Sequence, residues 1–269
     1  MTALSLASYR AMAIKCVIDF TKPDLSVVPH YSHLESTEKM NLSYWIGMAI
    51  TAIAADEVLG VSRTFHASNG GQKLTKANQR SRSLADLCGQ DTNNTWHIFE
   101  AKGRQTKPTP SAMNDWKAQA STVTHVNGSA IGTGSVGVAR ILKKMTFELL
   151  DPPSRPGKNG DIAINVADAR GKYYQPFVDF LAGDATGIQR GGRSFLMRAM
   201  MFDPVDRDYI WYGLEDKAYE MHKSKWARDV RVEELEDESL YVGSDGVAVL
   251  TSNSPCEING TEKSQKKAN

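Results

Sequence analysis

Asp86, Glu100 and Lys102 are the side chains whose types and spacing could do chemistry. If the segment around Glu100 is a β-strand, its period of two puts Glu100 and Lys102 on one face. A short apolar run that contains Asp86 precedes it, and the intervening Gln-Asp-Thr-Asn-Asn is typical of a hairpin turn. Centring that turn on Asn93 places Asp86 directly opposite Glu100, with their Cβ atoms roughly 5 Å apart.

Two acids that face each other predict a bound cation. Like charges directly opposite each other destabilise a sheet, and a divalent metal would compensate them. Oxygen ligands without a His or Cys partner suit Mg²⁺ or Mn²⁺, which keep several waters and bind substrate phosphates as well. Lys102 would face such a phosphate, where its ammonium group can position the attacking water or neutralise charge in the transition state. The pattern therefore indicates metal-assisted hydrolysis.

The two segments Leu-Ala-Asp86-Leu and Glu100-Ala-Lys102-Gly-Arg resemble the active-site signature of the PD-(D/E)xK nuclease superfamily, which has the restriction-endonuclease-like fold. The longer segments around them, residues 81–91 and 96–104, also resemble sequences of a group of uncharacterised bacterial proteins in that superfamily. The resemblance implies a metal-dependent nuclease in which Asp86 and Glu100 bind the metal. It further implies that the Ala101 carbonyl assists as a ligand and that Lys102 acts on the water.

The resemblance also suggests residues on the flanking helices. An acid on the preceding helix is common in the superfamily, which implies Glu57, in preference to Asp56, as a further metal ligand. Gln119 matches a glutamine found on the following helix in some branches, which implies a substrate contact there. The chain departs from the pattern at Ala85, where a proline is usual, and at Val123, where one exonuclease-like branch has a tyrosine. These departures leave the branch unassigned and keep open an inactive nucleic-acid-binding or assembly module with the same fold.

The residues around the hairpin are basic although the whole chain, with a net charge of +1, is not. Between residues 63 and 107 there are eight Lys or Arg residues and three acids. A basic rim around paired carboxylates suits a phosphate backbone, with Arg80, Arg82 and Arg104 as candidate contacts. The other interpretation is a solvated basic loop. The predicted partner is nucleic acid, with DNA favoured over RNA, and a homodimer or a partner protein stays open.

Periodicity and turn residues predict an α/β protein in which helices flank a mixed sheet. The expected elements are a helix at 41–59 capped by Asn41 or Ser43 and stopped by Gly60, a loop at 66–83, strands at 84–89 and 95–102, a Ser-capped helix at 111–123, a strand within 136–150, a linker at 151–160, helices at 172–182 and 214–226, and a strand–turn–strand unit at 239–251. The predicted organisation is an N-terminal arm or small helix (1–40), a restriction-endonuclease-like core (41–150), a C-terminal extension (151–252) and a disordered tail (253–269).

Composition excludes several other classes of protein. The three cysteines are far apart and form no C-x-x-C pair, so neither a disulfide framework nor a cysteine zinc site is predicted, and a cytoplasmic location fits best. The longest apolar run, residues 45–55, is too short to span a bilayer, so no membrane association is expected. Gly132-Thr-Gly134-Ser-Val-Gly137 matches a dinucleotide fingerprint by letter, but a loop leading into a β-branched strand is the favoured interpretation over an oxidoreductase.

Overall fold

The structure is a computed structural model that describes residues 3–22, 24–66, 73–74, 85–150, 160–203, 208–226, 231–236 and 239–252. The chain divides into two units, an N-terminal unit (Leu6–Ala169) and a C-terminal unit (Arg170–Asn269 with Met1–Ser5). Helices and mixed sheets make it a mixed α/β protein, as the sequence predicts. Most of the predicted loop at 66–83, the linker at 151–159 and the tail at 253–269 lie outside the described residues.

The N-terminal unit is built on a five-stranded sheet of order β10-β9-β6-β5-β3, in which β6 and β9 are parallel and the other neighbours antiparallel. Its elements are α1 (Ala3–Lys15), β1 (Ile18–Asp19), β2 (Ser26–Val27), the 3₁₀ turn η1 (Pro29–His33), α2 (Ser36–Leu59), β3 (Thr64–His66), β4 (Lys73–Leu74), β5 (Leu87–Gln90), β6 (Trp96–Arg104), α3 (Pro110–Ala120), β7 (His125–Val126), β8 (Ser129–Ala130), β9 (Thr133–Arg140), β10 (Thr146–Leu150) and β11 (Asp161–Ala163). Strands β4, β11, β7 and β8 form a small second sheet.

The β5–β6 hairpin has the predicted register. Leu87 pairs with Phe99 and Gln90 with Trp96, which is the pairing expected for a turn centred on Asn93. Asp91 builds that turn, because its Oδ1 accepts hydrogen bonds from the backbone N–H groups of Asn93 and Thr95, each at 2.8 Å. The sequence of the turn therefore fixes which residues of the two strands face each other.

Helix α2 begins five residues earlier than predicted and is not capped by Asn41 or Ser43. Glu35 and Glu38 form a capping box instead, each carboxylate accepting from the backbone N–H of the other. The predicted end of the helix is confirmed, since Gly60 adopts the left-handed conformation with φ 65° and its N–H bonds back into the last turn.

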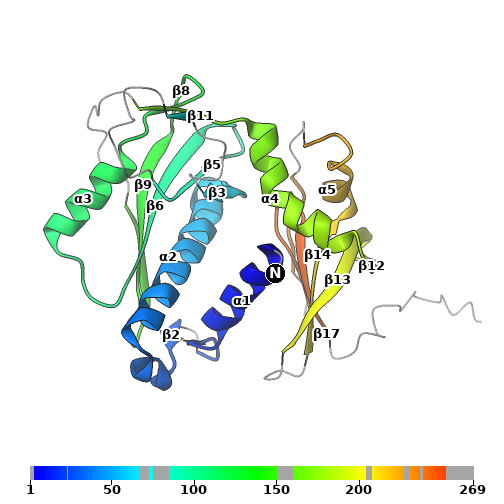
Figure 1. Cartoon of the computed structure of the whole chain (residues 1–269), viewed down its shortest axis with the longest axis horizontal. Coiled ribbons are helices and arrows are strands. Elements are labelled where there is room, and N and C mark those ends of the chain that lie inside the picture. The colour runs from blue at the N-terminus through cyan, green and yellow to red at the C-terminus, as the bar shows by residue number, and fades with distance from the viewer. Residues whose placement is uncertain are drawn as a thin grey trace, which may run out of the picture. The chain divides into compact units, whose positions relative to one another are not determined.

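Helices α2 and α3 cover opposite faces of the sheet (Figure 1). α2 lies against β6 at a very close distance, because a Cβ atom on Gly47 would be 2.5 Å from the backbone nitrogen of Gly103. α3 packs through Trp116 and Ala120 on Val136 and Val138 of β9. The cap of α3 is Thr109 and not a serine, since the Thr109 side chain accepts from the N–H of Ala112.

The glycine-rich segment that resembles a dinucleotide fingerprint is part of a strand. β9 starts at Thr133 and runs through Gly134 and Gly137 to Arg140, and β10 follows it as an antiparallel partner. A strand-to-helix turn, which the fingerprint requires, is therefore absent at this place in the described chain. The predicted strand within 136–150 is in fact the two strands β9 and β10.

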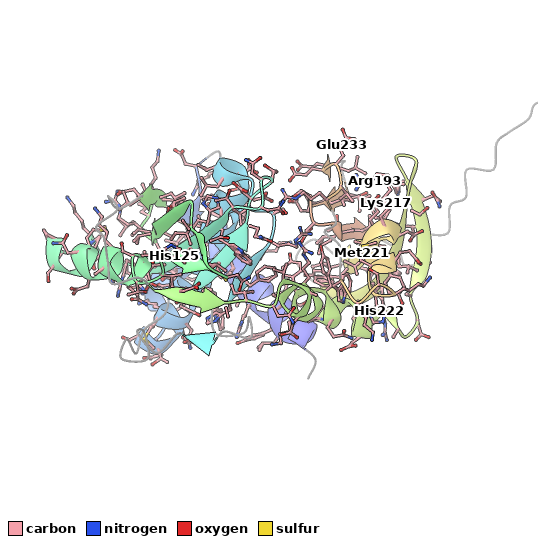
Figure 2. The ribbon with its side chains drawn as sticks, turned by 90° about the horizontal axis from the view of Figure 1, so that it is seen from above. His125, Arg193, Lys217, Met221, His222 and Glu233 are labelled. Carbon is pink, nitrogen blue, oxygen red and sulfur yellow. The ribbon has the colours of Figure 1, made fainter. Side chains whose placement is uncertain are left out.

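The C-terminal unit contains a six-stranded antiparallel sheet of order β12-β13-β14-β17-β16-β15. Its elements are α4 (Val166–Leu181), which begins in the N-terminal unit, β12 (Thr186–Arg190), β13 (Arg193–Asp203), β14 (Asp208–Glu215), α5 (Asp216–Glu220), β15 (Leu235–Glu236), β16 (Leu240–Val242) and β17 (Val247–Ser252). Arg193 Nη1 donates to the Glu233 carbonyl at 2.6 Å (Figure 2), which ties the start of β13 to the segment that precedes β15. One face packs on α4 and α5, and the other forms a separate apolar cluster.

The predicted helix at 214–226 is wrong for most of its length. Leu214 pairs with Val247 in the sheet, so long-range pairing decides the structure where local pattern favoured a helix. Only α5 is helical, and turns follow it up to Trp226, which has φ 59°. The strand–turn–strand unit at 239–251 is present as β16 and β17.

Helix α2 is also the one described helix that is long and apolar enough to cross a membrane by length and composition. Its most apolar 18-residue window has a mean hydropathy of 1.3, and a third of that window is buried. Core helices pass the same test, and α2 packs on β6 and β9 through Gly47 and Thr51.

Candidate active site

The structure brings Asp86, Glu100 and Lys102 together at the point where β5 begins. Lys102 Nζ donates to Glu100 Oε1, and it lies 3.6 Å from Asp86 Oδ2. Asp86 immediately precedes β5, and its Oδ2 accepts a hydrogen bond of 2.9 Å from the N–H of Ala101. β6 continues beyond this point without β5 beside it, so the site lies at an edge of the sheet.

Glu100 is a buried acid with an unsatisfied oxygen. Its side chain is 0% exposed, and Oε2 has no hydrogen-bond partner among the described residues. Its neighbour on β9 is Val136, which is also fully buried. Burial raises the pKa of Glu100 to about 7, Lys102 opposes that rise and the charge of Asp86 adds to it. Ionisation of Glu100 is therefore costly at this buried position, although Lys102 and a backbone hydrogen bond from Asp86 favour it.

Asp86 and Lys102 are the partly solvent-exposed residues of the site. Their side chains are 19% and 20% exposed, in contrast to Glu100. A ligand that reaches Glu100 would approach past these two side chains. Of these two exposed side chains, Lys102 carries the positive charge, so an incoming phosphate would contact its ammonium group before it reached Glu100.

The donor set fits a hard divalent cation. Asp86 and Glu100 supply two carboxylates, and the unpartnered Glu100 Oε2 is an oxygen that such a cation would satisfy. The described residues contain no cluster of three or more His, Cys, Asp or Glu side chains arranged to hold a metal ion, so a metal here would have two protein carboxylates as ligands. Two carboxylates completed by water and phosphate oxygens is the arrangement that Mg²⁺ prefers, whereas a Zn²⁺ site needs more protein ligands.

Of the predicted phosphate contacts, Arg104 is the one that the structure describes. It ends β6 two residues after Lys102, so the two basic side chains share a face of the strand. Its Cζ lies 4.8 Å from the centre of the Trp116 ring on α3, which holds the guanidinium over the indole. Gln119 lies half-buried in the last turn of α3. Arg80 and Arg82 lie outside the described residues.

The structure does not bring Glu57 to the carboxylate pair. Its side chain is exposed on α2, and no interaction recorded among the described residues joins it to Asp86 or Glu100. Helix geometry gives the reason, because Tyr44, which does lie near the pair, is thirteen residues earlier on α2. That separation is about 220° around the helix and roughly 20 Å along its axis.

Tyr44 is the site residue that sequence reasoning missed. Burial and the charge of Asp86 raise the pKa of its phenol, so the phenol lies within electrostatic range of the site. Met48, one turn later on the same side of α2, packs in the cluster that contains Leu87 and Phe99. Because β5 begins at Leu87, Tyr44 faces the edge that β5 leaves uncovered. The helix period puts Tyr44 and Met48 on one side of α2, but only the packing of α2 on the sheet decides that this side meets the site.

Comparison of the chain with family models, with curated proteins and with solved structures finds no match. The resemblance to the PD-(D/E)xK superfamily therefore rests on the residues of the β5–β6 hairpin and their surroundings.

Proposed function

We propose that the protein is a Mg²⁺-dependent nuclease that hydrolyses phosphodiester bonds in nucleic acid, with DNA as the favoured substrate. The observation that carries this proposal is the convergence of Asp86, Glu100 and Lys102 where β6 extends beyond β5, at a buried carboxylate oxygen that has no hydrogen-bond partner among the described residues. Such a trio is costly for a protein that does not use it, because the buried Glu100 carboxylate loses its hydration and one ammonium group balances only one of the two acids.

The fold around the site supports the proposal. The resemblance implies a helix, a hairpin and a second helix in that order, and α2, the β5–β6 hairpin and α3 follow each other in this way. α3 connects the parallel strands β6 and β9, so the carboxylates lie on a mixed sheet between two helical layers. This arrangement agrees with a restriction-endonuclease-like core.

Each site residue then has a defined part. Asp86 and Glu100 would hold the metal ion, which supplies Lewis-acid activation of the phosphate and of a bound water. Lys102 donates to the substrate phosphate or the water once its contact with Glu100 is released, and neutralises developing negative charge. Arg104, held over Trp116, binds a phosphate farther along the strand.

Cleavage assays with full-length protein test this function. Linear, circular and single-stranded DNA and RNA are incubated with Mg²⁺ or with EDTA, and Asp86→Asn and Lys102→Met are compared with Glu57→Gln as a matched acid on α2. We expect Mg²⁺-dependent cleavage that both site variants abolish and that Glu57→Gln retains. Cleavage that survives both site substitutions would refute the proposal.

One observation favours a second function, a nucleic-acid-binding or assembly module without catalysis. Lys102 contacts both acids, and burial raises the pKa of Glu100 to about 7, so the site is electrically balanced without a metal when Glu100 holds a proton. Such a module would bind nucleic acid through its basic rim but would show no Mg²⁺-dependent cleavage and no metal binding at Glu100.

A further inference from the structure

Four side chains from two helices form an aromatic and basic surface beside the site. Tyr44 and Trp45 lie on α2, and Tyr9 and Arg10 lie on α1. The rings of Tyr9 and Trp45 meet edge to face with centroids 6.1 Å apart. The Arg10 Cζ lies 5.6 Å from the centre of the Trp45 ring. We refer to these four residues as the aromatic surface.

The aromatic surface is accessible although its rings are large. Tyr9 is 60% exposed and Tyr44 is 44% exposed, and Trp45 is half-buried. A single exposed ring is ordinary, but here three rings and a guanidinium lie on the neighbouring helices α1 and α2, with Tyr9 and Arg10 both against Trp45. Aromatic faces and arginine are the groups on which nucleic-acid bases stack, while the guanidinium also attracts the phosphate backbone.

Tyr44 joins this surface to the candidate active site. Ser43 and Gly47, its neighbours on α2, contact the backbone of β6 at Lys102 and Gly103. The charges of Asp86 and Glu100 raise the pKa of the Tyr44 phenol, in addition to its burial. The charge of Arg10 acts on the same phenol in the opposite direction. The four residues therefore lie on α1 and α2 within the N-terminal unit, and α2 contacts the part of β6 that extends beyond β5.

We propose that the aromatic surface binds single-stranded nucleic acid and delivers it to Asp86, Glu100 and Lys102. This inference rests on the proposed function and names its substrate class, a single strand or a single-stranded end. In a duplex the bases stack on each other inside the helix and offer no face to a protein ring, whereas each base of a single strand has a free face. Arg10 then contacts the backbone between stacked bases.

Binding is measured by fluorescence anisotropy in EDTA, so that no cleavage occurs. The probes are labelled oligothymidylate and oligouridylate about 12 nucleotides long, and a duplex of the same length. The variants are Tyr44→Ala, Tyr44→Phe and Arg10→Met, and Tyr241→Ala, a tyrosine of β16 that is 50% exposed, is the matched control. Circular dichroism confirms that each variant is folded.

We expect the single strands to bind more tightly than the duplex. Tyr44→Ala weakens single-strand binding about fivefold or more, while Tyr44→Phe, which keeps the ring, and Tyr241→Ala leave it unchanged. Arg10→Met lowers the slope of log affinity against log salt by about 0.7. The deoxy and ribo probes show whether the strand is DNA or RNA.

Equal or tighter binding of the duplex would overturn the inference, and so would unchanged single-strand binding by Tyr44→Ala. Absence of binding to every oligonucleotide would also overturn it and would point to a protein partner for this surface. These outcomes are separate from the cleavage test. Retained single-strand binding without Mg²⁺-dependent cleavage would refute the nuclease function alone, and cleavage without a single-strand preference would refute this inference alone.

Discussion

Gly47→Ala should destabilise the protein although it replaces glycine by the best helix-forming residue. A Cβ atom at position 47 would lie 2.5 Å from the Gly103 nitrogen and 2.7 Å from the Lys102 carbonyl carbon, whereas ordinary contact begins near 3.4 Å. α2 would have to move away from β6 by about 1 Å, since the atoms that it meets belong to backbone. Overpacking of this kind costs about 3 kcal/mol, against about 1 kcal/mol gained in helix propensity.

The control lies two residues away on the same helix. Ala49 is exposed, so Ala49→Gly should lose only the propensity of about 1 kcal/mol. Urea unfolding followed by far-ultraviolet circular dichroism gives both free energies of unfolding. We expect a loss of about 2 kcal/mol for Gly47→Ala, opposite in sign to the propensity effect. A Gly47→Ala variant more stable than the original protein would show that α2 and β6 are not in such close contact.

Three further predictions concern the site and its support. Burial raises the pKa of Glu100 from 4.5 to about 7, so between these pH values the folded metal-free protein binds a proton that the unfolded chain releases. The free energy of unfolding should therefore fall by on the order of 3 kcal/mol as pH rises through that range. Urea titrations in EDTA should show this fall for the original protein and not for Glu100→Gln. Arg104→Lys keeps the charge but loses the planar group that stacks on Trp116, so KM for cleavage should rise about two- to fivefold with kcat unchanged, and an unchanged KM would remove Trp116 as a positioning residue. Asp91→Ala removes two hydrogen bonds to backbone N–H groups in the β5–β6 turn and should cost about 1–3 kcal/mol in urea unfolding, whereas a cost near zero would mean that the turn does not depend on Asp91.

The sequence predicts the hairpin well because its determinants are local. Side chains alternate along a strand, and the polar turn around Asn93 sets the pairing, so the register from Leu87–Phe99 to Gln90–Trp96 follows from a few residues, and Asp86 lies one residue before it. The end of α2 is predictable for the same reason, since Gly60 adopts a conformation that glycine favours. The start of α2 is not, because glutamate at residue 35 serves as an unusual cap.

Features that depend on distant contacts could not be predicted in this way. The segment from Leu214 onward has a helical pattern, but pairing with β17 and β13 holds Leu214 and Glu215 in a strand. Glu57 is predicted from its place in the sequence, whereas membership of the site depends on which side of α2 faces the part of β6 that extends beyond β5. Tyr44 lies on that side, and its position follows only from the packing of α2 against the sheet that contains β5 and β6.

The central claim is that Asp86 and Glu100 together hold one divalent cation. Calorimetric titration of the metal-free protein with Mn²⁺ tests it most directly, with Glu100→Gln and Asp86→Asn beside Glu57→Gln as control. We expect one binding event in the original protein and in Glu57→Gln, and its loss in both site variants. Binding that persists unchanged in Glu100→Gln and Asp86→Asn, or no binding to the original protein, would contradict the claim.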